Sequence, residues 1–220
     1  ALLMLDLFIG ERRRVVTHAL ALAVLLGAAA MIVAGVGGQG TVLAGMFVRD
    51  AVADVLKVFI LVITAASLGY AWTFMRERGL YKGELPVLVL FAAVGMMLLV
   101  SAPNLATVYV GLELLALCQY ALVAIDRDNA VGSEAAMKYF VLGSLASGLL
   151  LFGMSMVYGA TGSLDLATIS TAAAGVEGGT RTLLLTGTVF LVVGVCFKFG
   201  AAPFHMWLPN AYHGAPTPMT

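Results

Sequence analysis

The chain has 220 residues, of which 61% are hydrophobic and only 11% are charged, and its formal net charge is zero. Its mean hydropathy of +1.02 lies far above the values of soluble domains. The composition therefore excludes a soluble globular protein and indicates an integral membrane protein. No block of basic residues is present, so nothing indicates nucleic-acid binding.

Long apolar runs divide the chain into membrane spans, because a helix that crosses a bilayer needs about 20 apolar residues. The runs are continuous and do not alternate with polar residues, which excludes the strands of a transmembrane β-barrel. We therefore expect an all-α fold, a polytopic transmembrane helix bundle. The expected spans are a partial helix in residues 1–10, then residues 15–36, 51–75, 85–102, 104–125, 133–160 and 182–202, and a helical piece that begins near Phe204.

Both ends of the chain predict that the natural protein extends beyond them. Residues 1–10 are apolar and are followed by Glu11 and three arginines, which reverses the order of a signal peptide and is typical of the end of a span. At the other end, residues 216–220 stop without a closing helix. We expect a single transmembrane domain over residues 1–220 that is truncated at both ends, with about seven spans and the start of an eighth.

Positive charges are distributed unequally between the connectors. If the first helix ends in the cytoplasm, the connectors on that side hold Arg12, Arg13, Arg14, Arg76, Arg78, Lys82 and Arg127, and the opposite side holds only Arg49 and Arg181. The positive-inside rule then places the first set in the cytoplasm, or in the matrix of a mitochondrion.

Glu113 is the most informative charge within a span. It lies about ten residues into an apolar run of about twenty, so its short side chain reaches neither surface. A charge at mid-bilayer costs at least roughly 2.5 to 3.5 kcal/mol. Its structural interpretation is a neutral carboxyl that hydrogen-bonds to a neighbouring helix. Its functional interpretation is a carboxylate that exchanges protons and interacts with a lysine.

Lys198 ends an apolar run and is followed by the helix-breaking residues Gly200 and Pro203. On a straight helix the lysine would lie near the cytoplasmic end, where lysines commonly reach the surface. A break after Phe199 would instead leave free carbonyls and room for water near the membrane interior. The residues alone leave both positions open. His205, just beyond the break, is able to relay a proton because the usual pKa of histidine lies near neutrality.

Other charged residues near span ends favour structural roles. Lys138 follows Glu134 by four residues, the spacing of an ordinary ion pair within a helix. Asp54 and Lys57 lie near the start of their span at a spacing of three residues, which also favours a structural role. His18, near a helix end, is expected at the membrane interface.

Small residues are frequent in residues 143–148 and again at Gly153. Such residues allow helix backbones to approach closely in lipid. We interpret these small residues as positions where helices pack and not as residues of a functional site.

Four stretches carry a resemblance to a known family, namely Val110–Leu115, Gly132–Gly143, Tyr158–Gly162 and Phe197–Pro218. Together they resemble the antiporter-like membrane subunits of respiratory complex I, and the resemblance covers nearly the whole chain. The second stretch and Gly214–Pro218 indicate one branch of these subunits rather than its sister subunits or the related cation/proton antiporters. The resemblance implies an antiporter-like inverted-repeat fold with a discontinuous helix near residues 200–203, of which only the N-terminal half is present.

The resemblance also implies roles for residues already noted. Glu113 corresponds to the carboxylate of the fifth helix, Lys198 to the lysine of the broken seventh helix, and Lys138 to the sixth-helix lysine beside them. His205 matches a polar position that follows the break. These four residues are therefore the candidate site for proton translocation.

The family function implied is that of a non-redox, proton-translocating subunit of an NADH-quinone oxidoreductase, in which quinone reduction elsewhere drives pumping through buried Glu and Lys residues. No motif here binds a nicotinamide, flavin, iron–sulfur cluster, haem or metal, so NADH, FMN, iron–sulfur clusters and quinone are expected in partner subunits. The expected partners are other membrane subunits of complex I, the lipid bilayer and protons. The expected location is the inner membrane of a bacterium rather than of a mitochondrion.

Two alternatives stay open. A subunit of a cation/proton antiporter would share the fold and the charge pair, and sodium-dependent transport would identify it. A structural membrane subunit would tolerate neutral substitution of Glu113 and Lys198, with losses confined to assembly.

Overall fold

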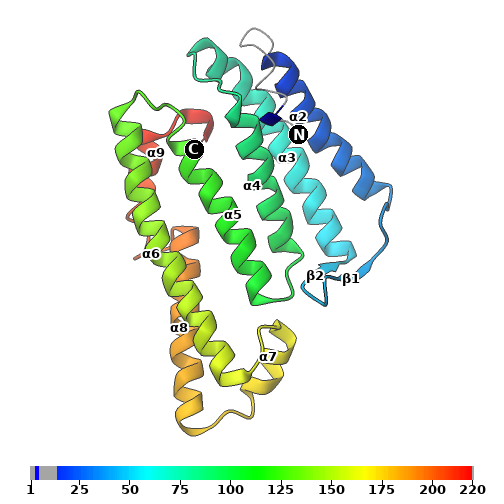
Figure 1. The fold of residues 1–220 in the computed structure, drawn as a ribbon, viewed down its shortest axis with the longest axis vertical. Coiled ribbons are helices and arrows are strands. Elements are labelled where there is room, and N and C mark those ends of the chain that lie inside the picture. The colour runs from blue at the N-terminus through cyan, green and yellow to red at the C-terminus, as the bar shows by residue number, and fades with distance from the viewer. Residues whose placement is uncertain (1–2, 5–13, 220) are drawn as a thin grey trace.

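Helices form most of the described chain and run roughly along one another (Figure 1). The computed structural model describes residues 3–4 and 14–219, so the partial helix expected in residues 1–10 lies largely outside the described residues. The elements are α2 (Arg14–Val33), β1 (Gly40–Val42), β2 (Phe47–Arg49), α3 (Ala51–Glu77), α4 (Glu84–Val100), α5 (Leu105–Val123), α6 (Ala130–Thr161), α7 (Leu166–Ala173), α8 (Gly178–Phe199), α9 (Leu208–Gly214) and the 3-10 helix η2 (Thr217–Met219).

Five of the described helices, α2, α3, α5, α6 and α8, are long and apolar enough to cross a membrane. Helix α4 is a shorter apolar helix of 17 residues, near the lower limit for a span. These helices confirm the all-α transmembrane fold class, and their bounds lie close to the expected spans. The sequence does not predict the antiparallel hairpin of β1 and β2 or the short helix α7, because both lie in connectors without a long apolar run.

Polar side chains fix where three of the spans begin. Asp50 accepts a hydrogen bond of 2.7 Å from the backbone N–H of Ala53, and Asn104 accepts one of 2.8 Å from that of Ala106. Asn129 caps α6 in the same way. These caps satisfy backbone donors that the first turn of a helix leaves unpaired, so each span begins at its capping residue.

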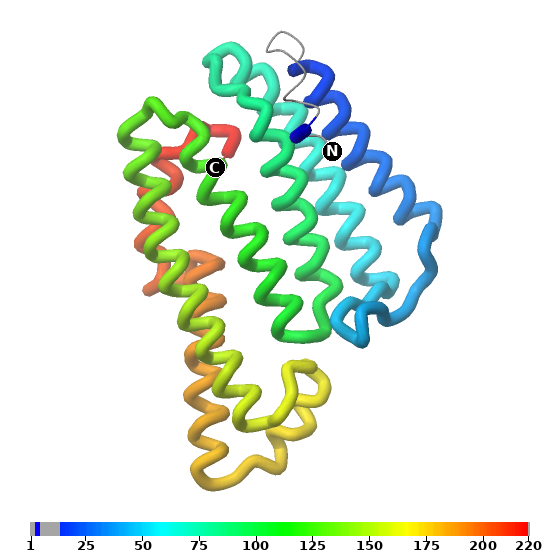
Figure 2. The backbone as a smooth tube through the Cα atoms, in the orientation of Figure 1, coloured from blue at the N-terminus to red at the C-terminus, as the bar shows by residue number. Residues whose placement is uncertain are grey.

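Alternating helix directions place the charged connectors at two opposite ends of the bundle. Figure 2 shows the start of α2, the α3–α4 loop and the α5–α6 loop at one end, and the hairpin and α7 at the other. The first, the Arg14 end, carries Arg14, Arg76, Arg78, Lys82 and Arg127, and the second, the hairpin end, carries Arg49 and Arg181. This distribution agrees with a cytoplasmic Arg14 end. Arg12 and Arg13 lie outside the described residues.

Two hydrophobic clusters hold the helices together. The first joins α2, α3 and α4 around Leu25, Leu68 and Leu85, which are almost fully buried. The second joins α5, α6, α8 and α9 and includes the buried aromatic residues Tyr139 and Phe197. This second cluster packs together the helices that carry the candidate site.

His18 lies in the first part of α2, near the Arg14 end, but its side chain is buried between neighbouring elements and does not face the surroundings. Its side chain is only 7% exposed, and Nδ1 lies 2.9 Å from the hydroxyl oxygen of Tyr81. The imidazole ring also packs against Trp72, with 4.6 Å between ring centroids. Helix α2 turns this face toward α3 and the α3–α4 loop, so a position near a helix end does not bring the ring to the surface.

Glycines set the separation of α6 and α8, which lie side by side (Figure 1). A Cβ atom added at Gly153 would lie 2.7 Å from the carbonyl oxygen of Gly187, and one at Gly194 would lie 2.8 Å from Cβ of Leu150. By contrast, a Cβ at Gly148 would have nothing within 4 Å. Of the small residues in this span, Gly153 therefore packs against a neighbouring helix and Gly148 does not.

Replacing Gly153 by Ala is expected to lower the free energy of unfolding by about 1–3 kcal/mol, because the two backbones must move apart. The thermal stability of the full-length protein in detergent measures this change. Gly148→Ala on the same helix is the matched control and is expected to leave the melting temperature nearly unchanged. Equal melting temperatures for the two variants would contradict the close approach at Gly153.

Candidate functional site

An ion pair joins α5 to α8 inside the bundle. Nζ of Lys198 lies 3.0 Å from Oε1 of Glu113, and it donates a second hydrogen bond, of 2.9 Å, to Oγ of Ser147 on α6. The hydroxyl of Ser147 donates in turn to the same carboxylate oxygen of Glu113. Each of the three side chains thus contacts the other two, and we call them the Glu–Lys–Ser cluster.

The cluster lies far from both ends of the bundle. Glu113 is in the central part of α5, and Ser147 is in the central part of α6. Helix α8 ends part-way along α6 (Figure 1), so Lys198 in its last turn reaches the same depth. The side chains of Lys198 and Glu113 are 11% and 22% exposed. Of the two positions left open for this lysine, the structure shows the interior one.

The break after α8 is what places the lysine at this depth. Gly200 has φ +64°, a left-handed conformation that glycine adopts at little cost, and it ends the helix. The N–H of Gly200 donates to the carbonyl of Phe197 at 3.0 Å, and that of Ala201 donates to the carbonyl of Cys196 at 2.9 Å. Pro203, joined to Ala202 by a cis peptide bond, follows, and helical structure resumes at α9. This agrees with the expected discontinuous helix near residues 200–203.

Trp207, which directly precedes α9, fixes the end of α8. Its indole N–H donates a hydrogen bond of 3.0 Å to the carbonyl oxygen of Phe197, the residue before Lys198. Its ring stacks on Tyr139 of α6, with 4.2 Å between centroids and 8° between planes. Trp207 is therefore bonded to the end of α8 and packed against α6 at once, which holds the backbone at Lys198 in place.

A polar pair and a small cavity lie beside Trp207. The hydroxyl of Tyr139 donates to Oε1 of Gln119 on α5 at 2.9 Å. Both residues, with Trp207, line a cavity of about 150 Å³ on the Arg14 side of the cluster. Several water molecules fit in this volume, because each occupies about 30 Å³ in the liquid, and the amide and the hydroxyl supply hydrogen-bond partners.

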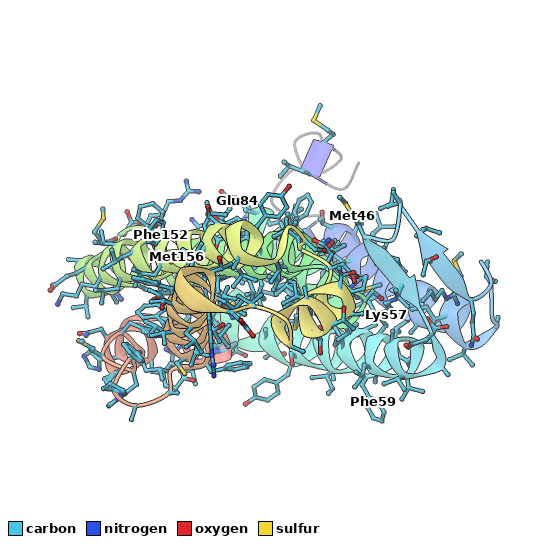
Figure 3. The ribbon with its side chains drawn as sticks, turned by 90° about the horizontal axis from the view of Figure 1, so that it is seen from below. Met46, Lys57, Phe59, Glu84, Phe152 and Met156 are labelled. Carbon is cyan, nitrogen blue, oxygen red and sulfur yellow. The ribbon has the colours of Figure 1, made fainter. Side chains whose placement is uncertain are left out.

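A second group of charges lies at the hairpin end. Lys57 of α3 is 3% exposed, and Nζ lies 4.6 Å from the centroid of the Phe47 ring on β2. Beside it, Arg49 forms an ion pair of 3.0 Å with Asp54. Figure 3 shows Lys57 on the side of α3 that faces the rest of the molecule and Phe59 on the outer side. These contacts join α3 to the hairpin, which is the structural role expected for Asp54 and Lys57.

The second half of the chain matches a known family of membrane proteins. Residues 102–220, more than half of the chain, match the family described as NADH:quinone oxidoreductase/Mrp antiporter, TM. The chain belongs to this family. The matched residues include all three members of the Glu–Lys–Ser cluster and the break after α8.

Relatives in the NADH:quinone oxidoreductase/Mrp antiporter family are similar over the whole chain. Proteins named NADH-quinone oxidoreductase subunit N from Xanthomonas euvesicatoria pv. vesicatoria (strain 85-10) and Thiobacillus denitrificans (strain ATCC 25259 / T1) are 63% identical over 220 residues and 51% identical over 222 residues. Each match covers 100% of this chain and 45% of the relative, so the chain spans less than half the length of these relatives. Their name agrees with the branch that residues 132–143 and 214–218 indicate in the sequence.

Solved structures show the same fold. A chain of respiratory complex I from Thermus thermophilus with bound Aureothin is similar with a TM-score of 0.77 and 36% identity, covering 99% of this chain and 46% of that chain. A chain of the Mrp complex from Dietzia sp. DQ12-45-1b is similar with a TM-score of 0.71 and 23% identity, covering 99% of this chain and 42% of that one. The second likeness concerns the fold alone.

The structure brings two of the four predicted site residues of this family member together. Glu113 and Lys198 form the ion pair. Lys138 instead lies 2.6 Å from Glu134, the ion pair within a helix that their spacing predicts, and both side chains are largely exposed in the described part of the chain. His205 is also exposed there. Among the described residues, no group of His, Cys, Asp and Glu side chains is arranged to hold a metal ion.

Ser147 is the cluster member that sequence reasoning misses. It lies in the run of small residues interpreted as packing positions, and nothing in that run distinguishes it from Ser144. In the structure Ser147 is 5% exposed, whereas Ser144 is exposed. Which of the two serines is buried depends on how α6 packs between α5 and α8. This packing cannot be deduced from a single sequence.

Trp207→Phe is expected to lower the free energy of unfolding by about 1 kcal/mol, because it removes the indole N–H but keeps an aromatic ring on Tyr139. Trp207→Leu removes both interactions and is expected to cost more. Thermal unfolding of the full-length protein ranks the two variants. If Trp207→Phe melted at the temperature of the native protein, the bond to Phe197 would not hold the break.

Proposed function

We propose that this chain is part of a proton-translocating membrane subunit of NADH-quinone oxidoreductase, the subunit N of a bacterial inner-membrane complex I. The observation that carries the proposal is the buried ion pair of Glu113 and Lys198, at the end of a broken helix and far from both ends of the bundle. Charges within a membrane are costly and most often mark the route of an ion or a proton. The names of the relatives support the same function.

The Glu–Lys–Ser cluster provides two groups whose protonation is coupled. The ammonium of Lys198 and the carboxylate of Glu113 stabilise each other across 3.0 Å, in surroundings where water screens charges poorly. When Lys198 gives up its proton, Glu113 loses its stabilising partner, so a proton that moves at one group changes the balance at the other. Ser147 accepts from the lysine and donates to the carboxylate, which keeps the two groups aligned.

The break and the adjacent cavity provide a way for protons to reach Lys198. A discontinuous helix exposes carbonyl groups that water can bond. The cavity beside Gln119 and Tyr139 lies on the Arg14 side of Lys198 and is not lined by any member of the cluster, so water there would cover one part of a route toward the cytoplasm. We include Lys138 and His205 at the margins of this route, since each lies outside the cluster and each can exchange protons.

Electron transfer belongs to partner subunits in this proposal. NADH, FMN, iron–sulfur clusters and quinone would bind there, and quinone reduction would drive changes that separate and rejoin the ion pair. The chain then contributes to an oxidoreductase as a pumping subunit, within a bundle of other membrane subunits. The likeness to a chain of respiratory complex I supports this arrangement.

Lys198→Ala and Glu113→Gln are expected to abolish coupled pumping, because each removes one partner of the pair. Protons pumped per NADH oxidised in membrane vesicles measure the effect, with assembly of the complex verified on a native gel. Glu177→Gln removes an exposed carboxylate that precedes α8 and makes no capping hydrogen bond there, and it is the matched control, for which we expect nearly normal pumping. Normal pumping in assembled Lys198→Ala complexes would refute the proposal.

A cation/proton antiporter subunit is the second candidate, because the family matched by residues 102–220 is described as including the Mrp antiporter as well as NADH:quinone oxidoreductase. Proton movement driven by a sodium gradient, in vesicles without quinone reductase activity, separates the two functions. We expect no such movement. A sodium-driven proton flux that disappears in Lys198→Ala would favour the antiporter.

A further inference from the structure

A basic pocket lies at the Arg14 end of the bundle, on elements that do not contribute to the Glu–Lys–Ser cluster. Arg14 at the start of α2, Arg76 in the last turn of α3 and Lys82 in the following loop all line it, together with Trp72 and Tyr81. Its volume is about 670 Å³. Three cationic side chains from three parts of the chain thus converge on one cavity.

The walls of the pocket are held in place by aromatic and hydrogen-bond contacts. Trp72 and Tyr81 pack edge to face with 4.7 Å between centroids, and the ring of His18 packs against both. Nη1 of Arg14 donates to the backbone carbonyl of Tyr81 at 2.7 Å. The guanidinium of Arg76 lies 5.6 Å from the centroid of the Trp72 ring. A ligand would therefore meet a preformed wall rather than loose surface side chains.

The charges of the pocket favour an anion. Among the described residues no carboxylate lines it, and Glu84, close by in sequence, lies 2.6 Å from Arg127 at a different pocket. Like charges that share a cavity repel one another, and a bound anion relieves this repulsion. Arg14 has other contacts that shape the wall, so the inference rests on Arg76 and Lys82.

The position of the pocket favours an anion that belongs to the membrane. Among the described residues, the connectors at the Arg14 end carry more lysines and arginines than those at the hairpin end, as expected where anionic lipid headgroups lie. Trp72 has the amphipathic character of residues at that interface. Along α2 from the pocket, Val16, Leu20 and Val24 lie four residues apart on one face and are 47%, 39% and 51% exposed, and this apolar face suits acyl chains.

We propose that the pocket binds the phosphate of an anionic phospholipid headgroup, with Arg76 and Lys82 as its charged ligands and the acyl chains along α2. A phosphate oxygen accepts hydrogen bonds from both cations, and Arg suits this group because its planar fork presents several donors. This site is independent of proton translocation and does not depend on the function proposed above.

Photolabelling with phosphatidylglycerol tests the site directly. The full-length protein in its membrane complex is placed in phosphatidylcholine vesicles that contain increasing fractions of photoreactive phosphatidylglycerol, and labelling of residues 14–82 is measured by peptide mass spectrometry. We expect saturable labelling of the native protein. For the variant Arg76→Gln with Lys82→Gln, the fraction that gives half-maximal labelling should rise about tenfold or more.

Arg78→Gln is the matched control. Arg78 lies two residues beyond Arg76, is exposed, and stacks on Phe74 at 4.1 Å without lining the pocket. Its replacement is expected to leave labelling unchanged. An equal loss in this control, or unchanged labelling in the double variant, would overturn the proposal, because surface charge alone would then attract the lipid.

Two further measurements, labelling with a different lipid and competition with phosphate, identify the anion. Photoreactive phosphatidylcholine should label these residues weakly and without saturation, and strong saturable labelling by it would overturn the selectivity for anionic lipid. Excess inorganic phosphate should not displace phosphatidylglycerol, and full displacement would assign the site to free phosphate.

If the double variant does not assemble on a native gel, Lys82→Gln alone, a loop substitution, gives the same comparison with a smaller expected shift.

Discussion

The contact of Lys198 with Glu113 is the interaction on which the rest of this structure depends. A single charge at the centre of a bilayer costs at least about 2.5 to 3.5 kcal/mol, so neither side chain would be stable there alone. Together, and with a hydrogen bond to Ser147, each charge has a partner of opposite sign and a polar neighbour. The Glu–Lys–Ser cluster requires three helices to meet at one depth, and the arrangement of α5, α6 and α8 meets that requirement.

Helix α6 is the scaffold of the site. One of its residues, Ser147, enters the cluster, and Gly153 brings α8 within backbone contact. Nearer its start, Tyr139 stacks on Trp207, which in turn bonds to the carbonyl of Phe197. These contacts hold the C-terminal end of α8 in place, although the helix ends next to the charged Lys198. The interruption itself supplies the polar backbone groups that a proton route through a membrane needs.

The sequence predicts the spans well because membrane helices follow from length and apolar composition, whereas the cap at Asn129 starts α6 at Ala130, ahead of the expected residue 133. Glu113 is predictable for the same reason, since its depth can be counted along one span. The depth of Lys198 is not predictable in this way. A straight helix would place this residue at the membrane surface, whereas a broken helix places it in the interior.

Features that depend on contacts between helices are absent from the sequence pattern. Ser147 cannot be told from Ser144, and the burial of His18 arises from Trp72 and Tyr81, which are far away in the chain. The hairpin is held by the pairing of its two strands and by contacts with α3. A pattern of apolar residues predicts neither of these. Sequence therefore predicts which residues lie at which depth, whereas tertiary packing decides which of them meet.

A double-mutant cycle with conservative replacements tests most directly whether the ion pair holds the helices together. Melting temperatures of the full-length protein in detergent are compared for Glu113→Asp, Lys198→Arg and the two combined; stability is the readout because arginine keeps its charge and cannot release a proton. We predict that the combined variant loses less stability than the sum of the two single losses, because the longer arginine reaches the shortened carboxylate. Single losses that simply add would show that the two charges do not interact in the folded protein, and would contradict the role given to the pair.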